Sequence, residues 1–307
     1  MAVGDIVTAS RFNLLQGQLA TILGTGTGDS GYGQVLQSRQ VSVGEIFDAD
    51  LMDALRADLA QARIHQTGAI PSEIGDINPE ETIGEDESEG DTTKGFADYE
   101  ALLADVITDK LVFAGTQVDV FAGIQAQRTT QWNGILEHEF TVTFDSANTR
   151  RHFFNTGGEI RLRATLSGYS GAKSTDWYDM FIAMGTVKFS AHGTTATGLG
   201  GGWTGSAIGN YELTSDYQTV FTKFGSGIYA ENYYSVQAKI SAVNQITYLA
   251  TFADLDPTAP DIDNPSYPPT DEFVDGTLTS IIEQQRTINA ITLPSPSFAN
   301  NPSKVLG

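Results

Sequence analysis

The sequence contains no cysteine, which excludes disulfides, zinc–thiolate centres and thiol nucleophiles. Basic residues are also few, because 17 lysines and arginines stand against 38 aspartates and glutamates and give a formal net charge of -21. A chain of this charge repels phosphate backbones, so we expect no direct binding to nucleic acid. No run approaches the roughly 18 apolar residues of a membrane span, and the first residues lack the basic and apolar regions of a signal peptide. We therefore expect no spanning segment, no signal peptide and no membrane partner.

The residues that are present indicate a protein rich in strands and loops. The chain of 307 residues is 40% hydrophobic, which is enough for two domains or for one domain with appendages. Charged residues reach only 18%, whereas glycine is frequent at 32 residues. This composition is typical of short strands joined by turns.

Residues 1–70 are predicted to form a helical segment around a glycine-rich loop. Thr8 or Ser10 is the expected N-cap of the first helix, and Gly24 ends it. The loop then continues to Gly33, where its glycines indicate either flexibility or a tight packing corner. The apolar stripe of this helix is formed by Phe12, Leu15, Leu19, Ile22 and Leu23.

The second helix of this segment is predicted to begin near Asp48 or Asp50 and to end at Gly68. Its spacing places Asp58 on the polar side. His65 lies near its C-terminal end, where a cation suits the helix dipole.

An acidic linker is predicted for residues 71–95, followed by a helix and a connector over residues 96–130. The linker carries nine acidic residues without a basic one between them until Lys94, which indicates a solvated segment. A calcium site is an alternative for the linker, although its spacing does not match an EF-hand loop. Apolar residues at helical spacing predict the third helix from about Ala97 to Phe113.

In residues 131–254 the pattern of apolar and polar residues changes to a period of two, which predicts an antiparallel β-sandwich. In the run from Arg150 to Arg163, a tight turn with two glycines leads into a strand that points Ile160 and Leu162 to the core. Residues 175–184 are more helical, and their aromatic side chains are expected to close one end of the sandwich. The other predicted strands lie within residues 137–144, 185–191, 229–241 and 245–252.

Residues 255–307 are predicted to form an extended, proline-rich tail that contains one strand-like run from Gly276 to Leu293. The predicted fold class is therefore α+β: an N-terminal helical segment, an antiparallel β-sandwich domain and this tail.

Motifs that suggest catalysis are incomplete. Residues 28–31 (Gly-Asp-Ser-Gly) resemble the nucleophile turn of chymotrypsin-like proteases, but no well-placed His and Asp precede them. Residues 24–28 alternate glycine without the Gly-Lys-Ser/Thr ending of a phosphate-binding loop. Ser170 and Lys173 have the Ser-x-x-Lys spacing of penicillin-binding enzymes without the two partner motifs. We expect no enzyme activity and no catalytic residues.

Histidine, acidic and aromatic residues are the candidates for metal and sugar sites. The histidines His65, His138, His152 and His192 are scattered, which does not favour zinc. Residues 254–264 hold acidic residues suited to calcium or, more commonly, to turns. Six aromatic residues either form a platform for a carbohydrate or, as is more common, pack in the core or an interface: Trp132, Trp177, Trp203, Tyr211, Tyr233 and Tyr234. We expect no cofactor, no cofactor-binding residue and no metal ligand.

Several motifs carry a family resemblance. They are Phe12-Asn13-x-Leu15-Gln16, Ile22-Leu23-Gly24-Thr25-Gly26-x-Gly28-Asp29-x-Gly31-Tyr32-Gly33-Gln34, Leu55-Arg56-x-Asp58, His65-Gln66-Thr67-Gly68 and Phe153-Phe154-Asn155-Thr156-Gly157-Gly158-Glu159-Ile160-Arg161. Through them, residues 5–68 and 131–252 resemble structural proteins of tailed bacteriophage particles, most closely those of cyanophages.

The resemblance implies a non-enzymatic virion structural protein of the tail, neck or fibre, located in the phage particle. Its helical segment 1–70 is expected to attach to other virion proteins and to copies of itself, with a trimer as one possible homo-oligomer. A carbohydrate- or receptor-binding tip module and a capsid decoration protein are the alternatives, and a depolymerase-like hydrolase is a third hypothesis.

Overall fold

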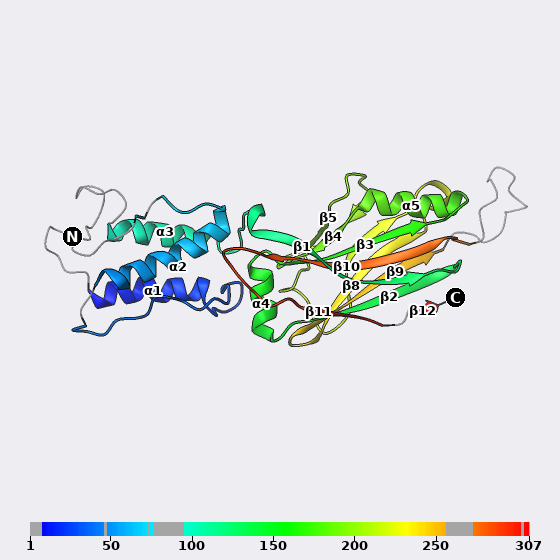
Figure 1. Cartoon of the computed structure of the whole chain (residues 1–307). Helices are drawn as coiled ribbons and strands as arrows, with labels where there is room; N and C mark the ends of the chain where they lie inside the picture. The colour runs from blue at the N-terminus through cyan, green and yellow to red at the C-terminus, as the bar shows by residue number, and fades with distance from the viewer. Residues whose placement is uncertain are drawn as a thin grey trace, which may run out of the picture. The chain divides into compact units, whose positions relative to one another are not determined.

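The computed structural model describes residues 8–45, 48–72, 74–75, 95–255, 273–301 and 304–306 (Figure 1). The chain divides into two units, each assembled from three segments. Unit 1 comprises residues 1–119, 148–158 and 286–294, and unit 2 comprises residues 120–147, 159–285 and 295–307. Helices at the N-terminal side and antiparallel strand pairs in unit 2 confirm the α+β class.

The long helices of unit 1 are α1 (Ala9–Leu23), α2 (Ala49–Thr67) and α3 (Phe96–Thr108). The first two begin and end where the sequence places their caps. The side chain of Thr8 accepts a hydrogen bond from the backbone N–H of Arg11, and Asp48 does the same for Leu51. Gly68 ends α2 in the left-handed conformation, at φ 80°.

The helix α3 ends at Thr108, a few residues before the predicted end. The chain turns immediately afterwards, because the N–H of Val112 donates to the carbonyl of Asp109.

The apolar stripes of these helices form one core in unit 1. It contains Phe12, Leu15, Leu19, Ile22 and Leu23 of α1, Leu51, Met52, Leu55, Leu59 and Ala62 of α2, and Phe96, Tyr99, Leu102, Leu103 and Val106 of α3. Ile291 and Leu293, from near the C-terminus, are buried in the same core. Each helix is too short to be stable alone, so its stability comes from this shared burial.

Two polar residues of α2 are buried, against the prediction for this helix. The carboxylate of Asp58 is not on a solvated side: it accepts from the N–H and the hydroxyl of Ser38, at 2.8 and 2.6 Å, and from the N–H of Gln37. His65 is not a cation at the helix end, because burial lowers its pKa from 6.5 to about 4. Asp58 thus fixes the segment of Gln37 and Ser38 to α2, while His65 packs edge-on against the ring of Tyr32.

The turn predicted before residue 159 is largely a helix, α4 (Ala147–Asn155). Only Thr156 to Gly158 form the turn, with Gly157 at φ 80°. The strand that follows, β3 (Glu159–Ser167), buries Ile160, Leu162, Ala164 and Leu166 as the alternation predicts.

Unit 2 contains two sheets among its described residues. In the five-stranded sheet the order is β1 (Val118–Arg128), β10 (Thr277–Thr287), β3, β4 (Val187–Phe189) and β5 (Thr194–Ala196). In the seven-stranded sheet the order is β11 (Ser297–Asn300), β2 (Gly134–Thr143), β9 (Gln245–Asp254), β8 (Tyr233–Ala242), β7 (Gln218–Phe224) and β6 (Trp203–Thr204), and β12 (Lys304–Leu306) also pairs with β2. One helix of this unit, α5 (Ala172–Met184), includes residues 175–184, which the sequence predicts to be helical.

The strand β10 differs from the prediction of an extended tail. It pairs antiparallel with β3, with Ile282 opposite Leu162, and lies inside the five-stranded sheet. The alternation of buried Leu278, Ser280 and Ile282 marks it as a strand, but its partner is more than 100 residues earlier in the chain. The preceding proline cluster and the acidic linker lie outside the described residues, as do most of the acidic residues weighed for calcium.

Side chains from both sheets meet in the core of unit 2. Phe189 of β4 packs edge-on against Tyr248 of β9, with ring centroids 5.3 Å apart. His138 of β2 lies 2.7 Å from the hydroxyl of Ser280 on β10. Trp177 of α5 packs against Phe252 of β9 and is fully buried, so this aromatic residue lies within the core, whereas Tyr178 of the same helix stacks on Tyr169. The two sheets are thus two layers around one apolar interior.

Candidate functional site

The glycine-rich loop after α1 satisfies its own backbone donors. The N–H groups of Tyr32, Gly33 and Gln34 donate to carbonyls at the end of α1, over 2.8 to 2.9 Å. A phosphate-binding loop aims such N–H groups at its anion instead. This pattern supports the interpretation of the loop as a packing corner.

The carbonyls of the same loop accept hydrogen bonds from α4. The guanidinium of Arg151 donates to the carbonyls of Ser30, Thr25 and Gly26, the last two at 2.6 and 3.1 Å. The side-chain amide of Asn155 donates to the carbonyl of Gly31 at 3.1 Å. One helix therefore holds the whole loop, and this contact accounts for the formation of so short a helix.

Two glycines leave no room for a ligand in this corner. Gly31 has φ +103°, and a β-carbon there would lie 2.1 Å from the carbonyl oxygen of Thr25. A β-carbon on Gly33 would lie 2.3 Å from Nδ1 of His152. The two ends of this corner are thus packed closely, and the carboxylate of Asp29 within it is paired with Lys110 at 2.8 Å.

Tyr32 links the loop to α2 and to the turn that follows α3. Its hydroxyl donates to the carbonyl of Lys110 at 2.9 Å and accepts from the side chain of Gln66 at 3.0 Å. Burial raises the pKa of Tyr32 to about 12, so the phenol stays neutral at physiological pH.

The Ser-x-x-Lys pair does not form a catalytic couple. The hydroxyl of Ser170 donates to Asp275 at 2.6 Å, whereas Nζ of Lys173 lies 3.1 Å from Asp254, fully buried. A nucleophile and its base must share a hydrogen bond, and these two side chains bind different carboxylates.

Three of the six aromatic residues considered for a carbohydrate platform are core residues, and Trp203, Tyr211 and Tyr233 are half-buried. Trp132, Trp177 and Tyr234 are buried, while Trp203 donates its indole N–H to the carbonyl of Gly198. Among the described residues, no group of three His, Asp or Glu side chains is arranged to hold a metal ion. Tyr233 is the one member of the six that lines a described hollow.

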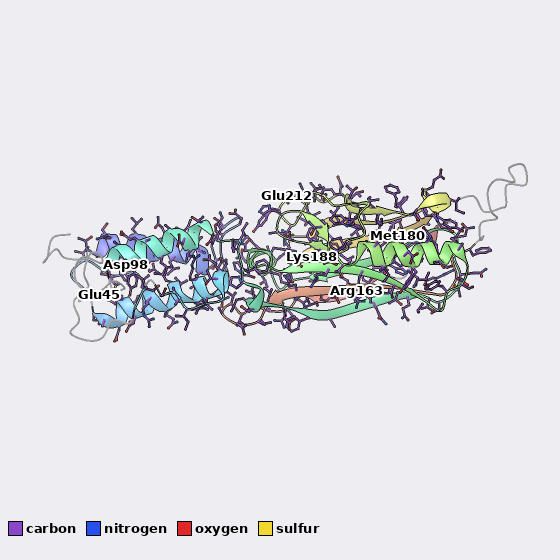
Figure 2. All side chains as sticks on the ribbon, turned by 90° about the horizontal axis from the view of Figure 1, so that it is seen from above. Glu45, Asp98, Arg163, Met180, Lys188 and Glu212 are labelled. Atoms are coloured by element: carbon purple, nitrogen blue, oxygen red, sulfur yellow. The ribbon has the colours of Figure 1, made fainter. Side chains whose placement is uncertain are left out.

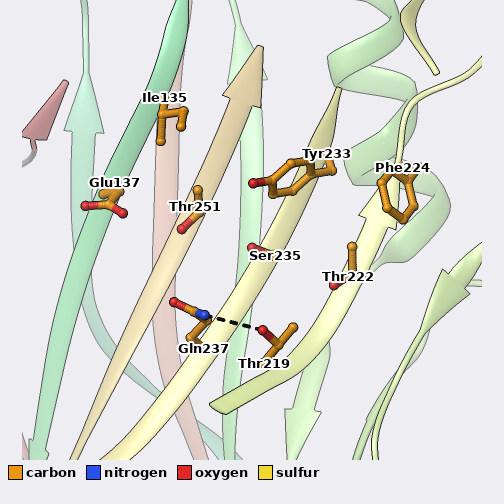
Figure 3. A pocket seen from close by; sticks show the side chains of 9 residues that line it. All are labelled: Ile135, Glu137, Thr219, Thr222, Phe224, Tyr233, Ser235, Gln237 and Thr251. Carbon is orange, nitrogen blue, oxygen red and sulfur yellow. Dashed lines mark hydrogen bonds between the residues drawn. The ribbon is translucent and has the colours of Figure 1, made fainter. Parts of the chain in front are cut away.

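That hollow lies on the outer face of the seven-stranded sheet and has a volume of about 410 Å³ (Figure 3). Its lining consists of Ile135, Glu137, Thr219, Thr222, Phe224, Tyr233, Ser235, Gln237 and Thr251. These side chains come from four neighbouring strands, β2, β9, β8 and β7. Hydroxyl, amide and carboxylate groups dominate, with an aromatic pair at one end.

Strand register orders these side chains into rows. Glu137, Thr251, Ser235 and Thr222 are successive cross-strand partners, so their side chains form one polar row across the sheet. Ile135, Ala253, Tyr233 and Phe224 form the adjacent row, which is apolar and aromatic. Because four strands are about 4.8 Å apart, each row spans about 14 Å. The surface is therefore polar along one line and apolar along the next.

Sequence reasoning missed this site because one strand is irregular. Thr219 and Thr222 are three residues apart, and a regular strand would point them to opposite faces. A bulge between Thr219 and Phe221 shifts the register, so Thr219 faces Gln237 and Thr222 faces Ser235. The alternation within the predicted strands 137–144, 229–241 and 245–252 indicated which residues share a face, but not which strands are neighbours.

The chain has no match among family models, curated proteins or solved structures. The described helices include none with the length and apolar character needed to cross a membrane.

Charged side chains on the five-stranded sheet are paired. Lys188 of β4 lies 2.8 Å from Glu159 of β3, and Arg163 lies 3.7 Å from Glu283 of β10; Lys188 and Arg163 are labelled in Figure 2. Such cross-strand pairs stabilise a sheet face and leave little charge for a ligand.

Proposed function

We propose that this chain is a non-enzymatic structural protein of a tailed-phage particle, in the tail, neck or fibre. It assembles there as a homo-oligomer through the N-terminal helices and contacts other virion proteins. A capsid decoration protein is the alternative position on the same particle.

The proposal rests on the hydrogen bonds that residues of the resembling motifs make inside the protein. The glycine-rich motif and the motif at residues 153–161 are separated by more than 100 residues, yet Asn155 donates directly to Gly31. Asp58, in a third motif, receives the hydrogen bonds of Ser38, and Gln66, in a fourth, donates to Tyr32. Residues committed to internal hydrogen bonds support a role in architecture rather than in chemistry.

A groove between α1 and α3 supports assembly through the helices. It has a volume of about 300 Å³ and is lined by apolar side chains, among them Leu14 and Ile107, which are 64% and 36% exposed. Arg11 and Glu100 form an ion pair of 2.8 Å on the same groove. Because this ion pair is satisfied within the chain, the exposed part of the groove that remains to be covered is apolar. In a two-fold dimer the same apolar strip on each copy covers the other, so we assign a second copy of this chain as its occupant.

The test is mass spectrometry and cryo-EM of purified particles produced by the genome that encodes this chain. We expect the chain in the particle at a symmetric position, and its absence from purified particles would end the proposal. In solution, light scattering should show an oligomer that Leu14→Glu dissociates. Val43→Glu changes an exposed valine outside the groove and serves as the control, because it should leave the oligomer intact.

A further inference from the structure

We propose that the hollow on the outer face of the seven-stranded sheet is a binding site for neutral oligosaccharides. This inference goes beyond the structural role, because it concerns a ligand and holds whether or not the chain lies in a particle.

The polar row offers hydrogen-bonding groups that the described residues leave unused. Among the side chains that the structure describes, none pairs with the hydroxyls of Thr222, Ser235 and Thr251, and Glu137 lies opposite Lys304 of β12 in the strand register. Ser235 and Thr251 are each only 8% exposed, so their environment is nearly closed on every side but the hollow. Polar groups at such depth require partners, which water supplies in the free protein and ligand hydroxyls supply in the complex.

The neighbouring row supplies the apolar contact that sugars need. The rings of Phe224 and Tyr233 lie 5.9 Å apart, and Phe224 is 51% exposed. A pyranose ring has C–H groups on its faces and hydroxyls around its edge. A sugar lying along the rows can therefore stack on the aromatic pair while its hydroxyls reach the polar row.

One further contact orders the site before a ligand arrives. The side-chain amide of Gln237 donates to the hydroxyl of Thr219 at 3.3 Å, as Figure 3 shows. This contact limits the rotamers of both side chains, which lowers the entropy cost of binding.

Charge selects the class of sugar. Glu137 is the only charged residue among those lining the hollow, and the chain carries a net charge of -21. Carboxylate oxygens accept hydrogen bonds from hydroxyls, whereas they repel sulfated or sialylated sugars. The length of about 14 Å, set by the spacing of four strands, suits a short chain of hexoses rather than one ring.

The test uses the full chain with maltotriose, cellotriose and tri-N-acetylchitotriose, and 3′-sialyllactose as the anionic probe. Saturation-transfer NMR and calorimetry should detect binding of at least one neutral trisaccharide at millimolar concentration or below. Phe224→Ala should weaken that binding about tenfold, since it removes the exposed ring. Glu137→Gln keeps the shape of the side chain and should weaken it about as much.

Ile182→Ala is the matched control, because Ile182 is an exposed apolar residue of unit 2 on α5 and outside the hollow. It should bind as tightly as the parent chain. Failure of all three neutral sugars to bind would overturn the proposal, and so would stronger binding of 3′-sialyllactose. Binding that Phe224→Ala and Glu137→Gln leave unchanged would also overturn it; if either variant unfolds, the other decides.

Discussion

The glycine-rich corner of unit 1 and the hollow of unit 2 are both built from small and polar residues, yet they treat hydrogen bonds in opposite ways. In the corner, Arg151 and Asn155 saturate the loop carbonyls. In the hollow, Ser235 and Thr251 have no side-chain partner among the described residues. Saturated polar groups stabilise one conformation, while unsaturated ones that reach solvent are available to a ligand. The extent to which polar groups are hydrogen-bonded therefore distinguishes the packing corner from the candidate binding site, and no sequence motif is needed for this distinction.

The unfolding of each unit can be followed by its own spectroscopic signal. All three tryptophans, Trp132, Trp177 and Trp203, belong to unit 2, so their fluorescence reports that unit alone. Far-UV circular dichroism is dominated by helices, most of which belong to unit 1. Urea unfolding with both signals therefore assigns each change in free energy to a unit.

The largest effect is expected for Gly31→Ala. Its β-carbon would overlap the carbonyl oxygen of Thr25, and the backbone is strained for any other residue, so unit 1 should lose at least about 3 kcal/mol. Gly28→Ala is the matched control: Gly28 also has a positive φ, but nothing lies within 4 Å of its β-carbon position, and the cost should be about 1 kcal/mol. Equal losses in the two variants would contradict the close-packed corner.

Acid should destabilise both units through buried histidines, of which His65 in unit 1 and His138 in unit 2 are completely buried. The pKa values of His65 and His138 are lowered from 6.5 to about 4 by burial, so the unfolded chain binds more protons between these values. The stabilisation is complete above pH 6.5 and disappears as the pH falls toward 4, which amounts to about 2 kcal/mol per histidine at pH 5.

The measurement is urea unfolding at pH 7 and pH 5. His65→Gln should reduce the acid sensitivity of unit 1 only, and His138→Gln that of unit 2 only. His192→Gln, at an exposed position, should change neither. If His65→Gln altered the tryptophan transition, the assignment of the units would need revision.

Arg151→Ala should cost unit 1 about 1.5 kcal/mol, because it removes charge-assisted hydrogen bonds to the loop. Arg39→Ala removes an exposed guanidinium paired with Glu45 and should have little effect. A loss in Arg39→Ala as large as in Arg151→Ala would show that the corner depends on general charge rather than on these contacts.

The smallest effect on stability is expected in the hollow. Thr222→Val removes a hydroxyl without a partner in the described structure and should change the free energy of unfolding of unit 2 by less than about 0.5 kcal/mol. The same variant should weaken trisaccharide binding. A large loss of stability would mean that the hydroxyl row supports the sheet instead of a ligand.

Local features of the fold were predictable from sequence, and distant pairings were not. Thr8, Asp48 and Gly68 act within one turn of their helices, so their residue types identify the helix ends. The helix α4 was missed because its hydrogen bonds go to a loop more than 100 residues away, and short helices have little intrinsic signal. Asp58 and His65 were misplaced for the same reason, since their partners and coverings come from other segments.

The candidate site was harder still to predict. Two of the three tryptophans that drew attention in the sequence, Trp132 and Trp177, pack in the core, whereas threonines and a serine line the hollow. Their alignment depends on pairing across four strands and on one bulge, and single-sequence periodicity contains neither.

The burial of Ile291 and Leu293 with α1, α2 and α3 sets an order of events during synthesis. The helices leave the ribosome long before the two residues that complete their interior, because nearly the whole of unit 2 is translated between them. The three helices must therefore wait, partly assembled, until Ile291 and Leu293 emerge, and until then they expose an open apolar seam.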